Sequence, residues 1–295
     1  MLTAAKDFLK IYWPLVLVAI GGIVLTLMLM DPAPPKTIRF AAGSPGGAYY
    51  AFAERYQRLL AEEDVEVELV QTAGSVENLR LLDEGQVDVA LVQGGLATPG
   101  DAQTLRSLGG LFHEPFWVFV RDEAGATQFG QLRDKRLAIG PVGSGTRLLA
   151  IELQEEFHGV WPDMTRNSLS GSAAAEALIA GQLDAAAFAA SPDAPYVQTL
   201  LRAPGISLMP FARAEALSRR QPALADVTLL RGVVDIGSDL PAEDIPLVAP
   251  VAQLVVNKSL HPAIEALLVD AASAIHQDGS LLARAGTFPD PDATD

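Results

Sequence analysis

The chain has 295 residues, which is enough for two modest lobes with separate cores once a terminal segment is set aside. Its 36 acidic and 21 basic residues give a formal net charge of −15. That charge argues against a nucleic-acid partner, because phosphate backbones attract the opposite sign. The absence of cysteine excludes disulfides, thiol catalysis and cysteine-ligated metal.

The N-terminal segment is predicted to be a membrane anchor. Residues 11–30 carry no charged side chain, and a helix of that length reaches about 30 Å, the thickness of the bilayer hydrocarbon. Lys6 and Lys10 precede the span and Asp31 follows it. This asymmetry predicts a cytoplasmic stub at residues 1–10 and a single-pass inner-membrane protein with its remainder in the periplasm. A cleaved signal peptide is the alternative, but the residues before Asp31 are bulky where a peptidase needs small ones.

Beyond a proline-rich linker at residues 31–36, strand and helix patterns alternate along the chain. This alternation predicts an α/β architecture with largely parallel sheets. The tail at residues 287–295, rich in proline and aspartate, is predicted to be flexible. Strands are expected at 37–41, 65–71, 87–93, 116–120, 136–140 and 185–190, and helices at 49–60, 75–84, 146–157 and 173–180.

An internal repeat predicts that the exported part consists of two similar lobes. Residues 40–50 match residues 137–147 at an offset of 97, and each copy reads as a strand, a glycine-rich turn and an amphipathic helix. Gly74-Ser75 matches Gly171-Ser172 at the same offset, and residues 85–88 match 181–184 at an offset of 96. Several matches at nearly one offset indicate a genuine duplication.

The glycine-rich turns are the predicted ligand site, because ligands of open α/β sheets bind beyond the carboxyl ends of the strands. Glycine lets the backbone approach a ligand closely, and a helix N-terminus offers free N–H groups and a partial positive charge. Two facing lobes would clamp a small carboxylate, with Arg147 as its bidentate partner. Alternatively, Ser75 and Ser144 are only helix caps and Arg147 is solvated. The predicted binding residues are Gly43, Ser44, Gly47, Tyr49, Ser75, Gln93, Gly143, Ser144, Gly145, Thr146 and Arg147.

An enzyme is not expected from this sequence. The histidines are scattered without metal-ligand spacing, at His113, His158, His261 and His276. Residues 143–145 lack the frame of a nucleophile elbow, and no glycine-rich turn carries the lysine of a phosphate-binding P-loop. We therefore expect no catalytic residue, no metal and no cofactor.

Four segments together resemble the TAXI family, the extracytoplasmic solute receptors of tripartite ATP-independent periplasmic (TRAP) transporters. They are Gly-Ser-Pro-Gly-Gly-Ala-Tyr-Tyr at 43–50, Thr-Ala-Gly-Ser-Val-Glu-Asn-Leu at 72–79, Gln-Val-Asp-Val-Ala-Leu-Val-Gln at 86–93 and Val-Gly-Ser-Gly-Thr-Arg at 142–147. The resemblance implies a type II periplasmic-binding-protein fold. It adds Thr72, within the second segment, to the predicted site, as well as Ser191, whose loop matches the family only loosely.

The resemblance also implies how the chain divides and what it does. Lobe one would comprise residues 37–121 and 247–286, with 116–121 as its outgoing hinge strand, and lobe two residues 122–246. The ligand would be a small carboxylate, such as glutamate or another amino acid, or an organic acid. A TRAP-type, ion-coupled permease would receive it. Family members are commonly exported by a cleaved signal, whereas this chain is predicted to be anchored.

Two other functions fit the same pattern. A tethered receptor could report its ligand to a membrane signalling partner, which would be obligatory because only about ten residues are expected in the cytoplasm. A receptor of similar fold could instead serve an ABC-type transporter as its substrate-binding protein. Neighbouring genes would discriminate between these functions. A multi-span permease would favour transport, a kinase would favour signalling, and a P-loop ATPase would favour an ABC-type transporter.

Overall fold

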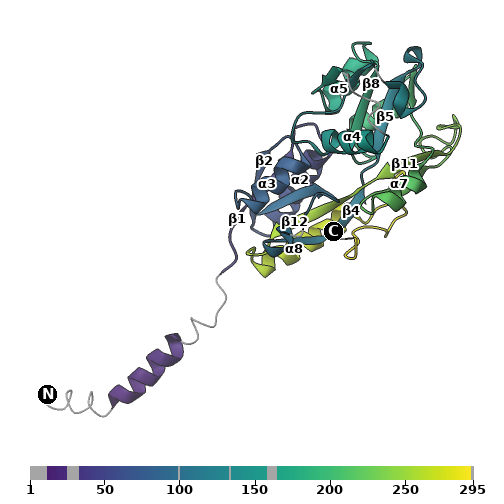
Figure 1. The fold of residues 1–295 in the computed structure, drawn as a ribbon. Helices are drawn as coiled ribbons and strands as arrows, with labels where there is room; N and C mark the ends of the chain where they lie inside the picture. The colour runs from purple at the N-terminus through teal and green to yellow at the C-terminus, as the bar shows by residue number, and fades with distance from the viewer. Residues whose placement is uncertain (1–11, 25–32, 99, 133, 158–164, 294–295) are drawn as a thin grey trace. The chain divides into compact units, whose positions relative to one another are not determined.

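The computed structural model describes residues 12–24, 33–98, 100–132, 134–157 and 165–293. The chain forms two compact units, Met1–Pro35 and Lys36–Asp295 (Figure 1). In the first unit, residues 12–24 are helical and expose apolar side chains such as Trp13 and Val18. Within the described ranges, no helix is both long enough and apolar enough to cross a membrane. The predicted anchor at residues 11–30 continues at both ends into residues outside those ranges.

The first of two five-stranded sheets in the second unit has the order β2-β1-β3-β12-β4. β1 pairs in parallel with β2 and β3, whereas β12 lies antiparallel between β3 and β4. Every residue of β3 is buried, as expected of a strand whose two faces are both covered. The strands are β1 (Thr37–Gly43), β2 (Glu66–Gln71), β3 (Val89–Gln93), β4 (Leu105–His113) and β12 (Val251–Asn257).

The second sheet repeats this arrangement with the order β7-β6-β8-β5-β9. β6 pairs in parallel with β7 and β8, and β5 lies antiparallel between β8 and β9, in the position that β12 holds in the first sheet. A separate antiparallel pair, β10 (Ala225–Leu229) and β11 (Ile245–Ala249), lies alongside. The strands of the second sheet are β5 (Phe116–Arg121), β6 (Arg136–Ala138), β7 (Thr165–Asn167), β8 (Ala185–Ala189) and β9 (Ile206–Leu208).

Hydrogen bonds at equivalent positions confirm the predicted duplication. The backbone N–H of Arg39 donates to Asp88 Oδ2 at 2.7 Å, and that of Arg136 donates to Asp184 Oδ2 at 2.8 Å. The offset is 97 at the arginines and 96 at the aspartates, so the second copy is one residue shorter between its first and third strands. In consequence, the residue equivalent to Ser75 is Gly171, each being the first residue of its helix, and not Ser172 as the sequence match predicted.

Each of the two sheets with its helices forms a lobe. Two short crossing segments join the lobes. Residues 114–115 connect β4 to β5, and Pro250 separates β11 from β12. The segments are hydrogen-bonded to each other, because the Glu114 N–H donates to the Pro250 carbonyl at 2.8 Å. The stretch at 247–257, predicted to lie wholly in lobe one, is therefore two strands that belong to different sheets.

Two further features differ from the sequence-based expectations. The sequence predicts β5 as part of lobe one, but its hydrogen bonds with β8 and β9 make it part of the second sheet. The tail predicted to be flexible is paired through Asp290, whose N–H and carbonyl both bond to Gly110 of β4 at 2.8 Å. Phe288 is buried and its ring lies edge-on to His113, which explains why this polar-looking segment is ordered there.

Helices pack against both sheets, and the buried apolar residues form two clusters in lobe one and one in lobe two. In lobe one, Phe40 and Tyr56 belong to the core beneath α2 and α8, and Leu82 to the core beneath α3. In lobe two the fully buried Trp117 donates its indole N–H to the Ala190 carbonyl at 2.9 Å. The helices are α2 (Ala48–Glu62), α3 (Ser75–Asp83), α4 (Gly145–Glu156), α5 (Gly171–Ile179), α6 (Pro195–Leu201), α7 (Ala214–Arg220) and α8 (Pro262–His276), with 3₁₀ turns at Asp101–Gln103, Asp122–Ala124 and Phe129–Leu132.

Candidate functional site

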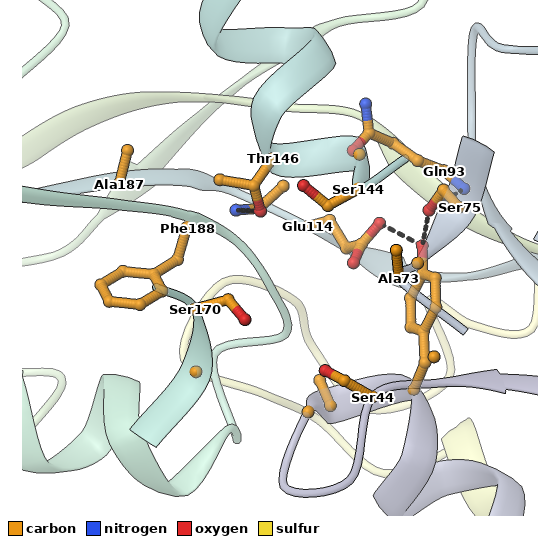
Figure 2. Close-up of a pocket in the computed structure, with 18 of the residues that line it drawn as sticks. Ser44, Ala73, Ser75, Gln93, Glu114, Ser144, Thr146, Ser170, Ala187 and Phe188 are labelled. Carbon is orange, nitrogen blue, oxygen red and sulfur yellow. Dashed lines mark hydrogen bonds between the residues drawn. The ribbon is translucent and has the colours of Figure 1, made fainter. Parts of the chain in front are cut away.

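A cavity of about 80 Å³ lies between the two lobes, at the ends of the glycine-rich turns (Figure 2). Both lobes and one of the crossing segments contribute to its wall. The lining residues are Gly43, Ser44, Gly47, Ala48, Tyr49, Ala73, Gly74, Ser75, Gln93, Glu114, Ser144, Gly145, Thr146, Ser170, Gly171, Ala187, Phe188, Ala189 and Tyr196.

The wall from lobe one is formed by the turn between β1 and α2 and by the start of α3. Gly43 adopts φ 76° and lets the chain leave β1 without a side chain between the turn and Tyr49. The Gly47 N–H donates to the Ser44 carbonyl at 2.9 Å, which closes the turn just before α2 begins. Ser44 in this turn and Ala48 at the start of α2 both line the cavity.

A chain of hydrogen bonds runs from β3 to the crossing segment. The Gln93 backbone N–H donates to Ser75 Oγ at 3.1 Å, and Ser75 Oγ donates to the Tyr49 hydroxyl at 3.2 Å. Tyr49 in turn donates to Glu114 Oε2 at 2.6 Å. All four residues are buried. Figure 2 shows the Glu114 carboxylate directed into the ring of labelled side chains, with Ser44 and Ser170 on its far side.

Burial dominates the electrostatics of this chain. It raises the pKa of Glu114 to about 7, although the hydrogen bond from Tyr49 lowers that pKa. Burial, and after it the charge of Glu114, raise the pKa of Tyr49 well above its usual range. Burial likewise raises the pKa of Tyr196, with a smaller contribution from Glu114. Tyr49 and Tyr196 are therefore neutral hydroxyls, and Glu114 is the group that titrates near neutral pH.

The wall from lobe two is formed by the starts of α4 and α5 and the end of β8. Ser144 caps α4, accepting a hydrogen bond from the Arg147 N–H at 3.2 Å and donating to the Pro141 carbonyl at 2.8 Å. Thr146 Oγ1 accepts from the Ala189 N–H at 3.0 Å and so ties α4 to β8. Phe188 packs on Tyr196, with ring centroids 5.2 Å apart.

Four helices begin at this cavity, two from each lobe. Ala48, Ser75, Gly145 and Gly171 are the first residues of α2, α3, α4 and α5, and all of them line it. The first turn of a helix has unpaired N–H groups and carries a partial positive charge of about half an electron unit. The backbone therefore makes much of the cavity wall attractive to an anionic group.

The lobes touch each other at the edge of the cavity. The Glu77 N–H of α3 donates to the Gly143 carbonyl of the opposite lobe at 3.3 Å. A Cβ atom at Gly74 would lie 3.3 Å from Ser144 Cα, and one at Gly143 would lie 3.3 Å from Ala73 Cβ. Glycine at these positions allows the backbones to meet, so the structure is of the closed type.

Nine of the thirteen predicted binding residues line the cavity, and four do not. Arg147 is half-buried and directs its guanidinium away, with Nε donating to the Gly140 carbonyl at 2.9 Å, so the predicted cationic partner for a carboxylate is outside this cavity. Gly143 lies at the lobe contact and Thr72 bonds to the Asn78 side chain. Ser191 accepts the Asp193 N–H within its own turn.

Sequence reasoning missed the most unusual residue of the site. Glu114 is the one charged side chain among the described residues that line the cavity. A signal existed, because Glu114 is the single acidic residue in the apolar stretch from Leu111 to Val120. The other missed residues are small or aromatic, and only the fold brings them here: Ala48, Ala73, Gly74, Ser170, Gly171, Ala187, Phe188, Ala189 and Tyr196. In the described ranges, no group of three or more histidine, aspartate and glutamate side chains is arranged to hold a metal ion.

Solved structures of other proteins share this fold. A protein from Bordetella bronchiseptica RB50 is 16% identical, with a TM-score of 0.56 over 82% of this chain and 71% of that one. The alkanesulfonate-binding protein of Xanthomonas axonopodis pv. citri, bound to MOPS, is 18% identical, with a TM-score of 0.51 over 83% and 74%. An ancestral arginine-binding protein bound to arginine is 13% identical, with a TM-score of 0.51 over 84% and 95%.

The two matching sheets, the paired crossing segments and the cavity between the lobes define a protein with the two-lobed fold of periplasmic binding proteins. A family model matches residues 40–269, which is most of the chain. The chain belongs to the NMT1-like family.

Proposed function

We propose that the protein is an extracytoplasmic solute receptor that captures one small solute between its lobes and passes it to a membrane permease. The observation that carries this proposal is the cavity itself. Each lobe contributes a glycine-rich turn and two helix N-termini to its wall, and a crossing segment lies at its edge. Such a wall is completed only when the lobes close, which is how a two-lobed receptor couples binding to a change of shape.

The solute carries a carboxylate, which binds at the helix N-termini instead of at Arg147. This part of the proposal is supported by the four helices that begin at the cavity. The permease is of the ion-coupled TRAP type, a choice that the TAXI-like segments at 43–50 and 142–147 support. Nine predicted residues from those segments and their neighbours line one cavity, as a shared receptor site requires.

A binding screen tests the receptor function. We expect full-length protein in detergent to be stabilised by a member of a panel of amino acids and small organic acids in a thermal-shift assay. Calorimetry should then give one solute per chain, and Arg147→Ala should bind as the wild type does because its guanidinium lies outside the cavity. Stabilisation by neutral sugars alone would refute the carboxylate, and no binder at all would refute the receptor function.

We also propose that the receptor is anchored in the inner membrane by residues 11–30, with the N-terminus in the cytoplasm. The apolar side chains exposed along residues 12–24 support this, since a helix that is apolar all round needs an apolar surrounding. Mass spectrometry of the mature protein is expected to find the N-terminal residues still attached. A mature chain that starts near Asp31 would instead make this a free periplasmic receptor.

A further inference from the structure

The position of Glu114 sets it apart from the rest of the cavity wall. It lies in the crossing segment between β4 and β5, and its backbone is bonded to the other crossing segment at Pro250. Glu114 is buried, with 3% of the residue exposed, yet no lysine, arginine or histidine is among the described residues lining the cavity. The Tyr49 hydroxyl donates a hydrogen bond to one oxygen of the carboxylate, Oε2. In Figure 2 the other oxygen, Oε1, points into the space between the labelled side chains.

An ionised, buried carboxylate with one neutral hydrogen-bond donor is energetically unfavourable in a folded protein. Desolvating an ion costs several kcal/mol unless an opposite charge and further hydrogen bonds offset the loss. Among the residues that the structure describes, the Glu114 carboxylate accepts one such bond, from Tyr49, whereas the buried Asn78 side chain bonds to the Leu91 carbonyl and to Thr72. Because Glu114 lines the cavity, an opposite charge can reach its carboxylate from there.

We propose that Glu114 is the subsite for a protonated amine on the solute, and therefore selects small amino acids over the corresponding organic acids. This inference rests on the proposed receptor function and deepens it. An amino acid has one ammonium group and one carboxylate, and the cavity presents a carboxylate and four helix N-termini. The ammonium donates to Glu114 Oε1, beside the rings of Tyr49 and Tyr196, which also favour a cation. The solute carboxylate accepts hydrogen bonds from the backbone N–H groups at the helix N-termini.

If the solute carboxylate bonded to Glu114 in place of the ammonium group, the affinity would depend on pH in the opposite direction. A protonated Glu114 could donate to a solute carboxylate, and that complex would weaken as pH rises. An ammonium requires the ionised carboxylate, so its complex strengthens as pH rises through the pKa of Glu114, which burial raises to about 7. The ionised fraction of such a group rises about tenfold between pH 6 and pH 8. At pH 7, binding an ammonium should release roughly half a proton.

The other groups that face Glu114 do not titrate between pH 6 and pH 8, so they do not affect this pH dependence. Tyr49 from α2 and Tyr196 from α6 have pKa values raised by burial, and they stay neutral at pH 8. The start of α4 offers Ser144 and Thr146, which do not titrate in this range. His113, adjacent in sequence, has a pKa lowered by burial, and its ring packs against Phe288 instead.

The test uses the full-length protein and pairs of probes that differ only in the amino group. L-glutamate with 2-oxoglutarate, L-alanine with pyruvate and L-leucine with 4-methyl-2-oxopentanoate are titrated, alongside all other amino acids, from pH 6 to pH 8. We expect an amino acid to bind about tenfold more tightly at pH 8 than at pH 6. Its oxo-acid partner should bind at least about 30-fold more weakly. Calorimetry in buffers of different ionisation enthalpy should detect the released proton.

Two variants connect the result to Glu114. Glu114→Gln keeps the shape and should cut affinity at least about 30-fold, because one partner of a buried charged pair is removed. It should also abolish the pH dependence while the unliganded protein melts no lower than the wild type at pH 8. Tyr49→Phe removes the hydrogen bond that the Tyr49 hydroxyl donates to the carboxylate, and it should move the pH of half-maximal affinity upward because that bond favours ionisation.

The outcomes separate this inference from the receptor function. Tighter binding of an oxo acid than of its amino acid, affinity that falls as pH rises, or full affinity in a folded Glu114→Gln would each overturn the amine subsite while leaving a solute receptor. Failure of every amino acid and every organic acid to bind would overturn both.

Discussion

Gly74→Val is expected to lower solute affinity at least about tenfold. Gly74 precedes α3 in lobe one and meets Ser144 of lobe two, and a Cβ atom there would lie 3.3 Å from Ser144 Cα. The branched valine side chain adds two methyl groups on that side, and they overlap the opposite backbone only when the lobes close. The variant should therefore fold, remain open and bind weakly. Calorimetric titration of the variant with the solute that binds the wild type measures the effect.

Gly85→Val is the matched control for the strain of a side chain at positive φ. Gly85 follows the other end of α3 with φ 66°, and apart from its chain neighbours no described residue comes within 4 Å of its added Cβ. Both substitutions should lower the melting temperature, since a branched residue in this region costs roughly 1–3 kcal/mol. Only Gly74→Val should lose affinity. Equal affinity of the two variants would show that the contact of Gly74 with Ser144 does not form when solute binds.

The duplication made the fold predictable from the sequence. Two copies of strand, glycine-rich turn and helix specify two similar lobes, and the paired bonds of Arg39 with Asp88 and of Arg136 with Asp184 show the same local structure. Predicted and observed element limits agree to within two residues for helices 49–60 and 75–84. Those elements are local, since their apolar spacing and end signals lie within the segment itself.

β4 was not predicted because its stabilising contacts are distant in sequence. It contains Gly109 and Gly110, which interrupt the apolar alternation that identifies a strand. A Cβ at Gly110 would lie 2.7 Å from Val251 Cγ1 of β12, so glycine is required by the close approach of the returning strand. The same glycine pairs with Asp290, which is why the C-terminal tail was mistaken for a flexible segment.

The site was predictable where the backbone forms it, and less so where side chains do. The turns near Gly43 and Gly145 follow from the repeat, and they line the cavity as expected. The direction of the Arg147 side chain does not follow from its position near a helix start. It turns to the Gly140 carbonyl, which lies two residues beyond the end of β6. Glu114 enters the site only because two crossing segments meet at Pro250.

An engineered disulfide across the lobe contact is expected to form faster when solute is present. The natural chain has no cysteine, so Ala73→Cys with Gly143→Cys introduces the only two thiols. In the closed structure a Cβ at Gly143 lies 3.3 Å from Ala73 Cβ, close to the roughly 3.5–4.5 Å of natural disulfides. Lobes that swing apart without solute would separate the two sulfurs. Saturating solute should raise the oxidation rate about tenfold if the empty protein is mostly open.

This oxidation rate, measured with and without the solute found in the screen, tests most directly whether solute is captured by closure of the two lobes. Binding by the reduced double variant should first be established, because cysteine at Gly143 must adopt φ 90°. Each single-cysteine variant should show no intramolecular oxidation. The account predicts a clear acceleration by solute and slow release of solute from the oxidised protein. An oxidation rate unchanged by saturating solute would contradict it.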